Sequence, residues 1–271
     1  MGKLVFVYII VISFYFNKSY ANDTLLNLNI EQTIPGSFTN CYVDNLGNIY
    51  LISATNQIKK LNSNLDSVAV FNDIKHFGTI DFIDVSNPLK ILVFYKAFST
   101  ITILDRFLSK KQTIDLRAIN IQQAACIAQG YDNTIWVYDE LDASIKKIDD
   151  FGKLLTTSTS FRMLFDEAVL PTNIIDKDGL LYLYSKNFGW LIFDYYGALK
   201  TKVMEKNWSD VQVINKTLFG HNHQELLWLQ PTLPLLHKRH FNINLKDVQK
   251  LIQSNGYFYT LTSKGVTIYS Y

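Results

Sequence analysis

Short runs of consecutive apolar residues recur along most of the chain, and each run is followed by turn-forming residues. β-Branched and aromatic residues dominate these stretches, as in Ile49-Tyr-Leu-Ile-Ser53 and Leu181-Tyr-Leu-Tyr-Ser185. Such residues are typical of β-strands, and strands that are apolar on both faces fit burial between stacked sheets. Helical periodicity is almost absent. The pattern therefore predicts an all-β protein.

One hairpin unit repeats along the sequence, with a turn-rich lead, an apolar strand, a polar link, a second apolar strand and then Asp or Asn. Equivalent positions are Ile49, Ile91, Ile135, Leu181, Leu218 and Phe258, separated by 42, 44, 46, 37 and 40 residues. The copy around residues 217–229 is degenerate. A period near 40 with short strands is the spacing of propeller blades. The repeat predicts a six-bladed β-propeller, and the alternative is a β-sandwich or an open stack of hairpins.

The two ends of the chain complement each other. The last unit supplies only three strands, at residues 248–252, 257–262 and 266–269, and lacks an outer strand. Residues 25–33 alternate in the same way and precede the first unit. Pairing of the two termini would remove exposed strand edges, so we expect the ring to be closed by a terminal strand.

Residues 1–21 have the features of a secretory signal peptide. Lys3 lies near the start, residues 4–16 form an apolar run of 13 residues, and Ser19 and Ala21 are small residues at the cleavage-determining positions. The alternative is a membrane anchor, but the run is shorter than the roughly 20 residues that a spanning helix needs. We expect cleavage after Ala21, a propeller domain over residues 22–271 with no transmembrane segment, and export.

The composition narrows the possible partners. Apolar residues make up 48% of the chain and charged residues 18%, which excludes general disorder. Lys and Arg number 26 against 24 Asp and Glu, a net charge of +2. This charge is too small and too evenly mixed for a nucleic-acid-binding surface, so no nucleic-acid partner is expected.

The chain has two cysteines, Cys41 and Cys126. Aligning the repeats places Cys41 opposite Ile127, so the two thiols point to opposite sheet faces in non-adjacent units. An exported protein can form disulfides, but this geometry predicts two free, packed thiols.

The motif Asp44-Asn-Leu-Gly-Asn-Ile-Tyr50 with Ile58-Lys-Lys-Leu-Asn62 resembles the six-bladed propellers that include NHL-repeat and SMP-30-like secreted proteins. The middle of the chain, residues 84–95 with Ile103-Leu-Asp105, is similar to uncharacterised exported propeller proteins of Bacteroidota. That resemblance implies a periplasmic or outer-membrane-associated role.

Resemblance to lactonases of this fold implies a metal-dependent alternative, in which carboxylates and amides of the innermost strands hold calcium. The expected innermost strands are instead apolar: Tyr42-Val43, Ile127-Ala128, Ile174-Ile175, Val213-Ile214 and Leu251-Ile252. Asp44 and Asp176 are expected to cap hairpin turns. No cofactor is expected.

Histidines provide the weaker metal candidates, His221, His223, His237 and His240. Residues two apart on a strand share a face, so His221 and His223 would be able to chelate a divalent cation. The alternative is that they are solvated side chains at a hairpin tip, where Lys238 and Arg239 would repel a cation. The chain also lacks a Gly-x-Ser-x-Gly elbow, a phosphate-binding loop and a Cys-x-x-Cys pair.

Aromatic residues in connecting segments are the candidate partner-binding residues: Phe188, Trp190, Tyr195, Tyr196 and Trp208. Exposed aromatics bury a large area at little cost in side-chain entropy. The sequence therefore favours a non-enzymatic interaction module in a cell-envelope assembly, bound to protein partners and associated with the outer membrane through one of them. The alternatives are a metal-dependent lactonase-like or hydrolase-like enzyme and a glycan-binding propeller.

Overall fold

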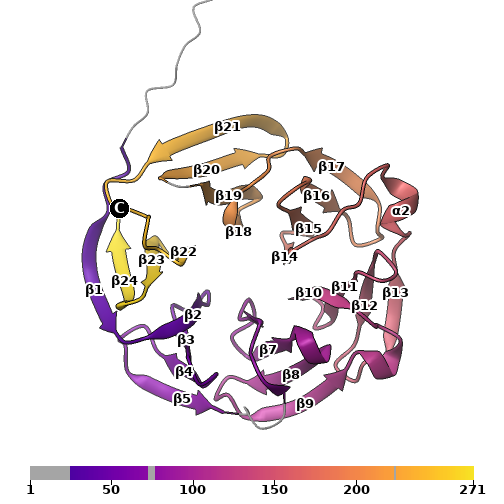
Figure 1. Cartoon of the computed structure of the whole chain (residues 1–271), viewed down its shortest axis with the longest axis horizontal. Coiled ribbons are helices and arrows are strands. Elements are labelled where there is room, and N and C mark those ends of the chain that lie inside the picture. The colour runs from indigo at the N-terminus through magenta and orange to yellow at the C-terminus, as the bar shows by residue number, and fades with distance from the viewer. Residues whose placement is uncertain (1–24, 73–76, 223) are drawn as a thin grey trace, which may run out of the picture.

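Six four-stranded antiparallel sheets are arranged radially around an axis in the computed structural model, which describes residues 25–72, 77–222 and 224–271 (Figure 1). Each sheet is one blade, and the blades follow one another in chain order. The predicted six-bladed β-propeller is confirmed. The expected signal peptide, residues 1–21, lies outside the described residues.

The strands occupy equivalent places in blades 1 to 6. The first strands, nearest the axis, are β2 (Phe38–Val43), β6 (Phe82–Asp84), β10 (Ala124–Gln129), β14 (Asn173–Lys177), β18 (Ser209–Ile214) and β22 (Lys250–Ser254). The second strands are β3 (Ile49–Ser53), β7 (Lys90–Tyr95), β11 (Ile135–Asp139), β15 (Leu180–Ser185), β19 (Thr217–Asn222) and β23 (Tyr257–Thr262).

The third strands are β4 (Ile58–Leu61), β8 (Thr100–Asp105), β12 (Ser144–Ile148), β16 (Gly189–Phe193), β20 (Glu225–Gln230) and β24 (Gly265–Ser270). The outer strands, on the rim in Figure 1, are β5 (Ser67–Phe71), β9 (Lys110–Asp115), β13 (Leu154–Thr157), β17 (Leu199–Val203), β21 (Leu233–His240) and β1 (Asn29–Pro35). Short helices η1 (Lys96–Phe98), η2 (Arg117–Ile119) and α2 (Phe161–Leu164) lie in connections.

The ring closes through the N-terminal strand, as the sequence predicts. β1 pairs antiparallel with β24 from Asn29 opposite Ser270 to Pro35 opposite Gly265, and completes blade 6. The strand begins at Asn29 rather than at residue 25, because Leu26 and Leu28 are buried against the end of blade 5. This closure leaves β24 without a free edge.

Blade 5 is a complete four-stranded sheet, although its sequence copy is degenerate. Its first two strands are joined by Asn215 and Lys216, both with positive φ, at 49° and 59°. Two left-handed residues are the signature of a tight type I′ hairpin turn. The turn is conformationally ordinary, but it lacks the glycine that the equivalent turns of blades 1, 3, 4 and 6 contain.

The hydrophobic core is divided into six clusters, one at each seam between consecutive blades. The seam between blades 2 and 3, for example, contains Leu92, Phe94, Ile127 and Ile135, none more than 1% exposed. Each sheet thus buries both of its faces against its neighbours, which is the reason that its strands are apolar at successive positions.

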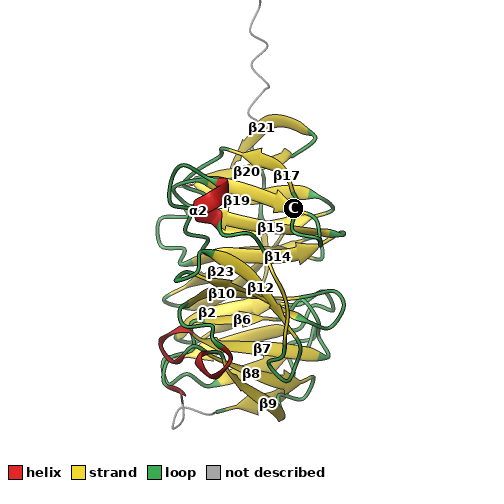
Figure 2. Ribbon diagram, turned by 90° about the vertical axis from the view of Figure 1, so that its right-hand side faces the viewer, coloured by secondary structure: helices red, strands yellow, loops and turns green. Residues whose placement is uncertain are grey.

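Antiparallel order within the blades gives the ring two faces. Face I carries the turns between the first and second strands and between the third and outer strands; face II carries the remaining connections. Figure 2 views the ring edge on, with connections on both sides of the stacked strands. No helix in the described part of the chain is long and apolar enough to cross a membrane.

Candidate functional site

The turns between the third and outer strands of blades 1 to 4 share one geometry, which exposes the side chain of the third turn residue on face I. In blades 1 to 4 the turn to the outer strand begins at Asn62, Asp105, Asp149 and Asp194. The side-chain Oδ1 of each accepts the N–H groups two and four residues further on, at 2.8–3.0 Å. The residue between these two donors has positive φ. This bonding pattern fixes the turn and turns the third side chain outward.

Aromatic residues occupy that third position in three successive blades. Phe107, Phe151 and Tyr196 are 56%, 82% and 95% exposed. Seven aromatic side chains are strongly exposed in the described part of the chain, and six of them lie on face I: Phe107, Tyr131, Phe151, Tyr196, Tyr257 and Tyr271. The seventh, Phe98, lies on face II in η1. Face I is therefore the aromatic face of the ring.

Three of the aromatic residues singled out in the sequence are buried, and the expectation that they are exposed on loops is wrong. Trp190 and Trp208 are at most 1% exposed and pack edge to face at 6.0 Å in the seam between blades 4 and 5. Phe188 is 5% exposed in the seam between blades 3 and 4. A residue that flanks a hairpin can face the next blade, so a loop position in the sequence does not imply exposure. Tyr196 is exposed and Tyr195 is half-buried.

Tyr195 belongs to a polar and aromatic cluster that joins blades 3 and 4 on face I. Its ring stacks on Tyr131 with centroids 4.6 Å apart, and its hydroxyl donates to Asp176 Oδ1 at 2.6 Å. Trp136 Nε1 donates to Asp176 Oδ2 at 2.8 Å, and the Tyr131 N–H donates to the same oxygen. Lys147 lies over the Trp136 ring at 4.7 Å.

Asp176 is thus an acceptor between blades, and the expectation that it caps its own turn is wrong. Burial raises the pKa of Asp176, while hydrogen bonds from Tyr195 and Trp136 act in the opposite direction. Asp44 does cap its turn, as predicted, because its Oδ1 accepts the N–H groups of Leu46 and Asn48 at 2.9 Å.

An axial cavity of about 440 Å³ opens among the first strands of blades 1, 2, 4, 5 and 6. Val43, Ile175 and Val213 of the expected apolar strands form part of its wall, whereas Ile127-Ala128 and Leu251-Ile252 do not line it. The lining also includes Asp84, Asp176, Gln212 and Gln253. The expected apolar lining is therefore incomplete.

Hydrogen bonds between blades engage these axial polar groups. Asp84 Oδ2 accepts the Gln129 N–H of blade 3 at 2.7 Å. Gln212 accepts the Gln253 N–H at 2.9 Å and donates to its carbonyl at 3.1 Å. The first strand of each blade has one unpaired edge, whose backbone groups need partners. These side chains supply them and join neighbouring blades.

The structure does not bring the candidate metal-ligating histidines together. His221 Nε2 lies 2.9 Å from Asp210 Oδ2 in blade 5, whereas His237 stacks on Trp228 with ring centroids 5.3 Å apart. His240 lies 3.7 Å from Glu225. His223 is outside the described residues. Among the described residues, no three His, Cys, Asp or Glu side chains are placed to hold a metal ion.

Both cysteines are free and buried, as predicted. Cys41 lies in the seam between blades 6 and 1, and Cys126 in the seam between blades 3 and 4. Burial raises the pKa of Cys41 to about 11 and raises that of Cys126 as well. Neither thiol is an activated nucleophile at neutral pH.

Sequence reasoning missed five exposed aromatics of face I: Phe107, Phe151, Tyr131, Tyr257 and Tyr271. The first two had a readable signal, because Asp105-Arg-Phe-Leu-Ser109 and Asp149-Asp-Phe-Gly-Lys153 share a turn pattern with Asp194-Tyr-Tyr-Gly-Ala198. Tyr131 had no such signal, because its contacts come from the next blade.

No protein-family model matches the chain, and no curated protein matches it in sequence. Among solved structures, a streptogramin B lyase aligns with a TM-score of 0.60 at 15% identity, covering 85% of this chain and 78% of that one. A catalytically inactive virginiamycin B lyase from Staphylococcus aureus, solved with quinupristin, aligns with a TM-score of 0.59 at 13% identity and 88% coverage of both chains. The β-propeller domain of Cps50 (Swd1) from Myceliophteria thermophila gives 0.60 at 8% identity, covering 90% of this chain and 99% of that one.

At these low sequence identities, the structural similarity establishes the propeller fold alone. The fold is a common scaffold for protein interaction, and its neighbours here include an enzyme.

Proposed function

We propose that the chain is an exported, non-enzymatic interaction module that docks a protein of the cell envelope on face I. The observation that carries the proposal is the concentration of six exposed aromatic side chains on that face, three of them at the same turn position. Tyr and Phe are enriched in the cores of protein interfaces, and a few buried anchor residues of this kind carry most of the binding energy. Rigid turns on a closed ring present them with little loss of entropy on binding.

The arrangement at the axis supports binding rather than catalysis. Asp84, Asp176 and the Gln212–Gln253 amide pair are engaged in hydrogen bonds between blades. A general acid or base needs a proton-accepting atom within reach of substrate. Breaking these contacts for catalysis would loosen the ring.

The signal-like residues 1–21 and the similarity of residues 84–95 to exported Bacteroidota propellers support the proposed location. Together with the NHL-repeat and SMP-30-like motif at Asp44–Asn62, they favour a secreted propeller in the periplasm or at the outer membrane. Attachment to the membrane would then be through the partner.

The test compares cross-linked complexes formed in producing cells by three forms of the full chain. Phe151→Ser combined with Tyr196→Ser removes two anchors from face I. Met163→Ser is the matched control, because Met163 is 81% exposed in α2 on face II. We expect wild type and Met163→Ser to capture the same protein and the double variant to lose it. Recovery of monomer alone, or equal capture by all three, would overturn the proposal.

A further inference from the structure

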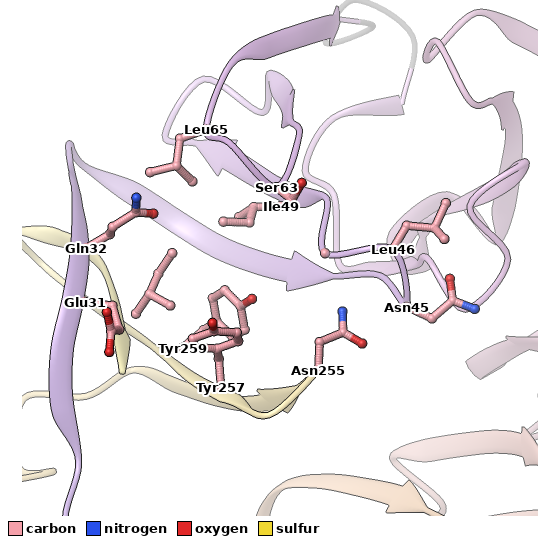
Figure 3. A pocket seen from close by; sticks show the side chains of 12 residues that line it. Glu31, Gln32, Asn45, Leu46, Ile49, Ser63, Leu65, Asn255, Tyr257 and Tyr259 are labelled. Atoms are coloured by element: carbon pink, nitrogen blue, oxygen red, sulfur yellow. The ribbon is translucent and has the colours of Figure 1, made fainter. Parts of the chain in front are cut away.

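The seam between blades 6 and 1 contains a cavity of about 550 Å³ that opens on face I (Figure 3). Blade 6 contributes Tyr257, Tyr259 and Ile268 to its lining, together with Glu31 and Gln32 from β1. Asn45, Leu46, Ser63 and Leu65 line it from the two turns of blade 1. Its volume is in the range of small-molecule sites, roughly 300–1,000 Å³.

The cavity lies at a seam where the second residue of the turn to the outer strand has a short side chain, whereas at two other seams the side chain in that place reaches the preceding blade. In blades 2, 3 and 4 the second residue of the turn to the outer strand contacts the preceding blade. The Arg106 carbonyl accepts Lys60 Nζ at 2.8 Å, Asp150 pairs with Lys90, and Tyr195 stacks on Tyr131. The equivalent residue in blade 1 is Ser63. Its short side chain makes no hydrogen bond in the described structure and leaves the seam open.

A second replacement at the same seam widens the gap. On the strand pair of blade 1, Lys60 lies opposite Tyr50 and reaches across to blade 2. The residue in that place in blade 6 is Ile268, opposite Tyr259. Isoleucine cannot make the bridging hydrogen bond, so the polar contacts of this seam on face I lie nearer the axis, where Ser254 Oγ and Asn255 Nδ2 each donate to the Asp44 carbonyl at 3.4 Å.

The mouth of the cavity is also kept clear by Gly47. A Cβ at this position would lie 3.5 Å from Ser63 Cβ and 3.7 Å from Asn255 Nδ2. Asn45 and Asn255 line both this cavity and the axial one. The two cavities therefore adjoin on face I.

Uncharged polar groups dominate the chemistry inside. The side-chain amides of Gln32 and Asn45 and the hydroxyl of Tyr257 make no hydrogen bond within the described chain. Burial raises the pKa of Tyr259, with smaller contributions from Tyr257 and Asp44, so its hydroxyl is a proton donor at neutral pH. Amide and hydroxyl groups both donate and accept.

The charge of the lining narrows the ligand class. No Lys, Arg or His lines the cavity, which leaves an anionic group without a counterion. Glu31 is the one carboxylate among the described lining residues, too few for a hard divalent cation. Two tyrosine rings offer apolar faces beside the amides. A neutral molecule with both hydroxyl groups and apolar C–H faces fits this combination.

We infer that the seam cavity binds a neutral oligosaccharide, whose hydroxyl groups pair with Asn45, Gln32 and Glu31 and whose ring faces pack on Tyr257 and Tyr259. This site is separate from the aromatic turns of blades 2 to 4 that dock the proposed protein partner.

The test uses cello-, malto-, manno-, xylo- and chito-oligosaccharides as probes, with polygalacturonate and a proline-rich peptide as competitors, in titration calorimetry on the full chain. Ser63→Tyr fills the cavity as Tyr195 fills the seam in blade 4, and removes none of the proposed hydrogen-bonding groups. Asn64→Tyr is the matched control, because its neighbouring turn position points outward, as Tyr196 does.

We expect at least one neutral oligosaccharide to bind wild type, and Ser63→Tyr and Tyr257→Ala to weaken it by about tenfold or more. Asn64→Tyr should bind within about twofold of wild type, and thermal unfolding should show that all variants are folded. Absence of binding by every neutral probe, tighter binding of either competitor, or equal losses in Ser63→Tyr and Asn64→Tyr would overturn the inference. Capture of a protein partner through face I should be unchanged in Ser63→Tyr, so failure here and failure of the proposed function are distinguishable.

Discussion

Replacing Asp176 by leucine should destabilise the ring at the seam between blades 3 and 4. The substitution leaves three donors without their acceptor: Trp136 Nε1, the Tyr195 hydroxyl and the Tyr131 N–H. A buried donor without a partner costs about 1–3 kcal/mol. Trp136 is 5% exposed and bears the full penalty, whereas Tyr195 and Tyr131 are reached by water. We expect a total loss of about 2–4 kcal/mol.

Asp176→Asn is the matched control for this change. Its carbonyl oxygen can accept from Trp136 and Tyr131, and its amide can donate to the Tyr195 hydroxyl, which is also an acceptor. The three contacts are kept while the charge is removed. We expect Asp176→Asn to unfold within about 1 kcal/mol of wild type.

The pH dependence separates the charge from the hydrogen bonds. Burial raises the folded-state pKa of Asp176 above its ordinary value of 3.8, against hydrogen bonds from Tyr195 and Trp136. A carboxyl group whose pKa is raised in the folded state stabilises that state most when it is protonated. The free energy of unfolding of wild type should therefore fall as the pH rises through the folded-state pKa of Asp176. Asparagine does not titrate. The stability of Asp176→Asn relative to wild type should therefore increase from about pH 3.5 to about pH 7.

Urea unfolding followed by tryptophan fluorescence measures the stability of Asp176→Leu, the stability of Asp176→Asn and the pH dependence of the difference from wild type. If the leucine and asparagine variants lost the same stability, or if the relative stability of Asp176→Asn fell with pH, the assignment of Asp176 as a buried acceptor between blades would be refuted.

Three further predictions concern buried thiols, a buried lysine and a strained glycine. Iodoacetamide should leave Cys41 and Cys126 unmodified in the native protein at about pH 8 and alkylate both in denaturant, since only the thiolate reacts; mass spectrometry showing native modification would contradict this. Burial lowers the pKa of Lys250 to about 8 from 10.5, against the charges of Cys41 and Asp210, so the folded state releases its proton first. Wild-type stability should therefore rise relative to Lys250→Met between those pH values in urea titrations. Gly265→Ala would place a Cβ 2.1 Å from the Ile34 carbonyl oxygen at φ +134° and should cost about 1–3 kcal/mol by thermal unfolding; Gly256→Ala, at φ +79° with open space around it, should cost less.

The architecture could be predicted from the sequence because blade formation depends on local signals. Each copy of the repeat contains its own alternating strand pattern and turn residues, and the six equivalent positions all fall in second strands. Ring closure was also predictable, since one unit lacked a strand and the other terminus supplied one. The degenerate copy still forms a blade, because the turn at Asn215 and Lys216 brings its first two strands together without a glycine.

The candidate site was less predictable because its contacts join residues of different blades. Asp176 meets donors at Tyr131 and Trp136, 45 and 40 positions away, and nothing in its own turn signals them. Trp190 and Trp208 lie in neighbouring segments of the chain but pack into one seam. Whether a side chain is buried at a seam depends on the position of the facing blade, which cannot be predicted from the sequence of a single hairpin.

Because the blades repeat, equivalent positions at different seams can be compared directly, and the comparison shows which turn positions vary between blades. The turn that begins at Asn62 has the same bonding as those at Asp105, Asp149 and Asp194, so the fold is maintained whatever residue occupies its second position. That position is free to vary, and at Ser63 the variation opens a cavity without disturbing a strand. Similarly, the third position can carry an exposed aromatic or Asn64 with no change in the turn. The side chains at the second and third turn positions can therefore change from blade to blade, while the bonding of the turn stays the same.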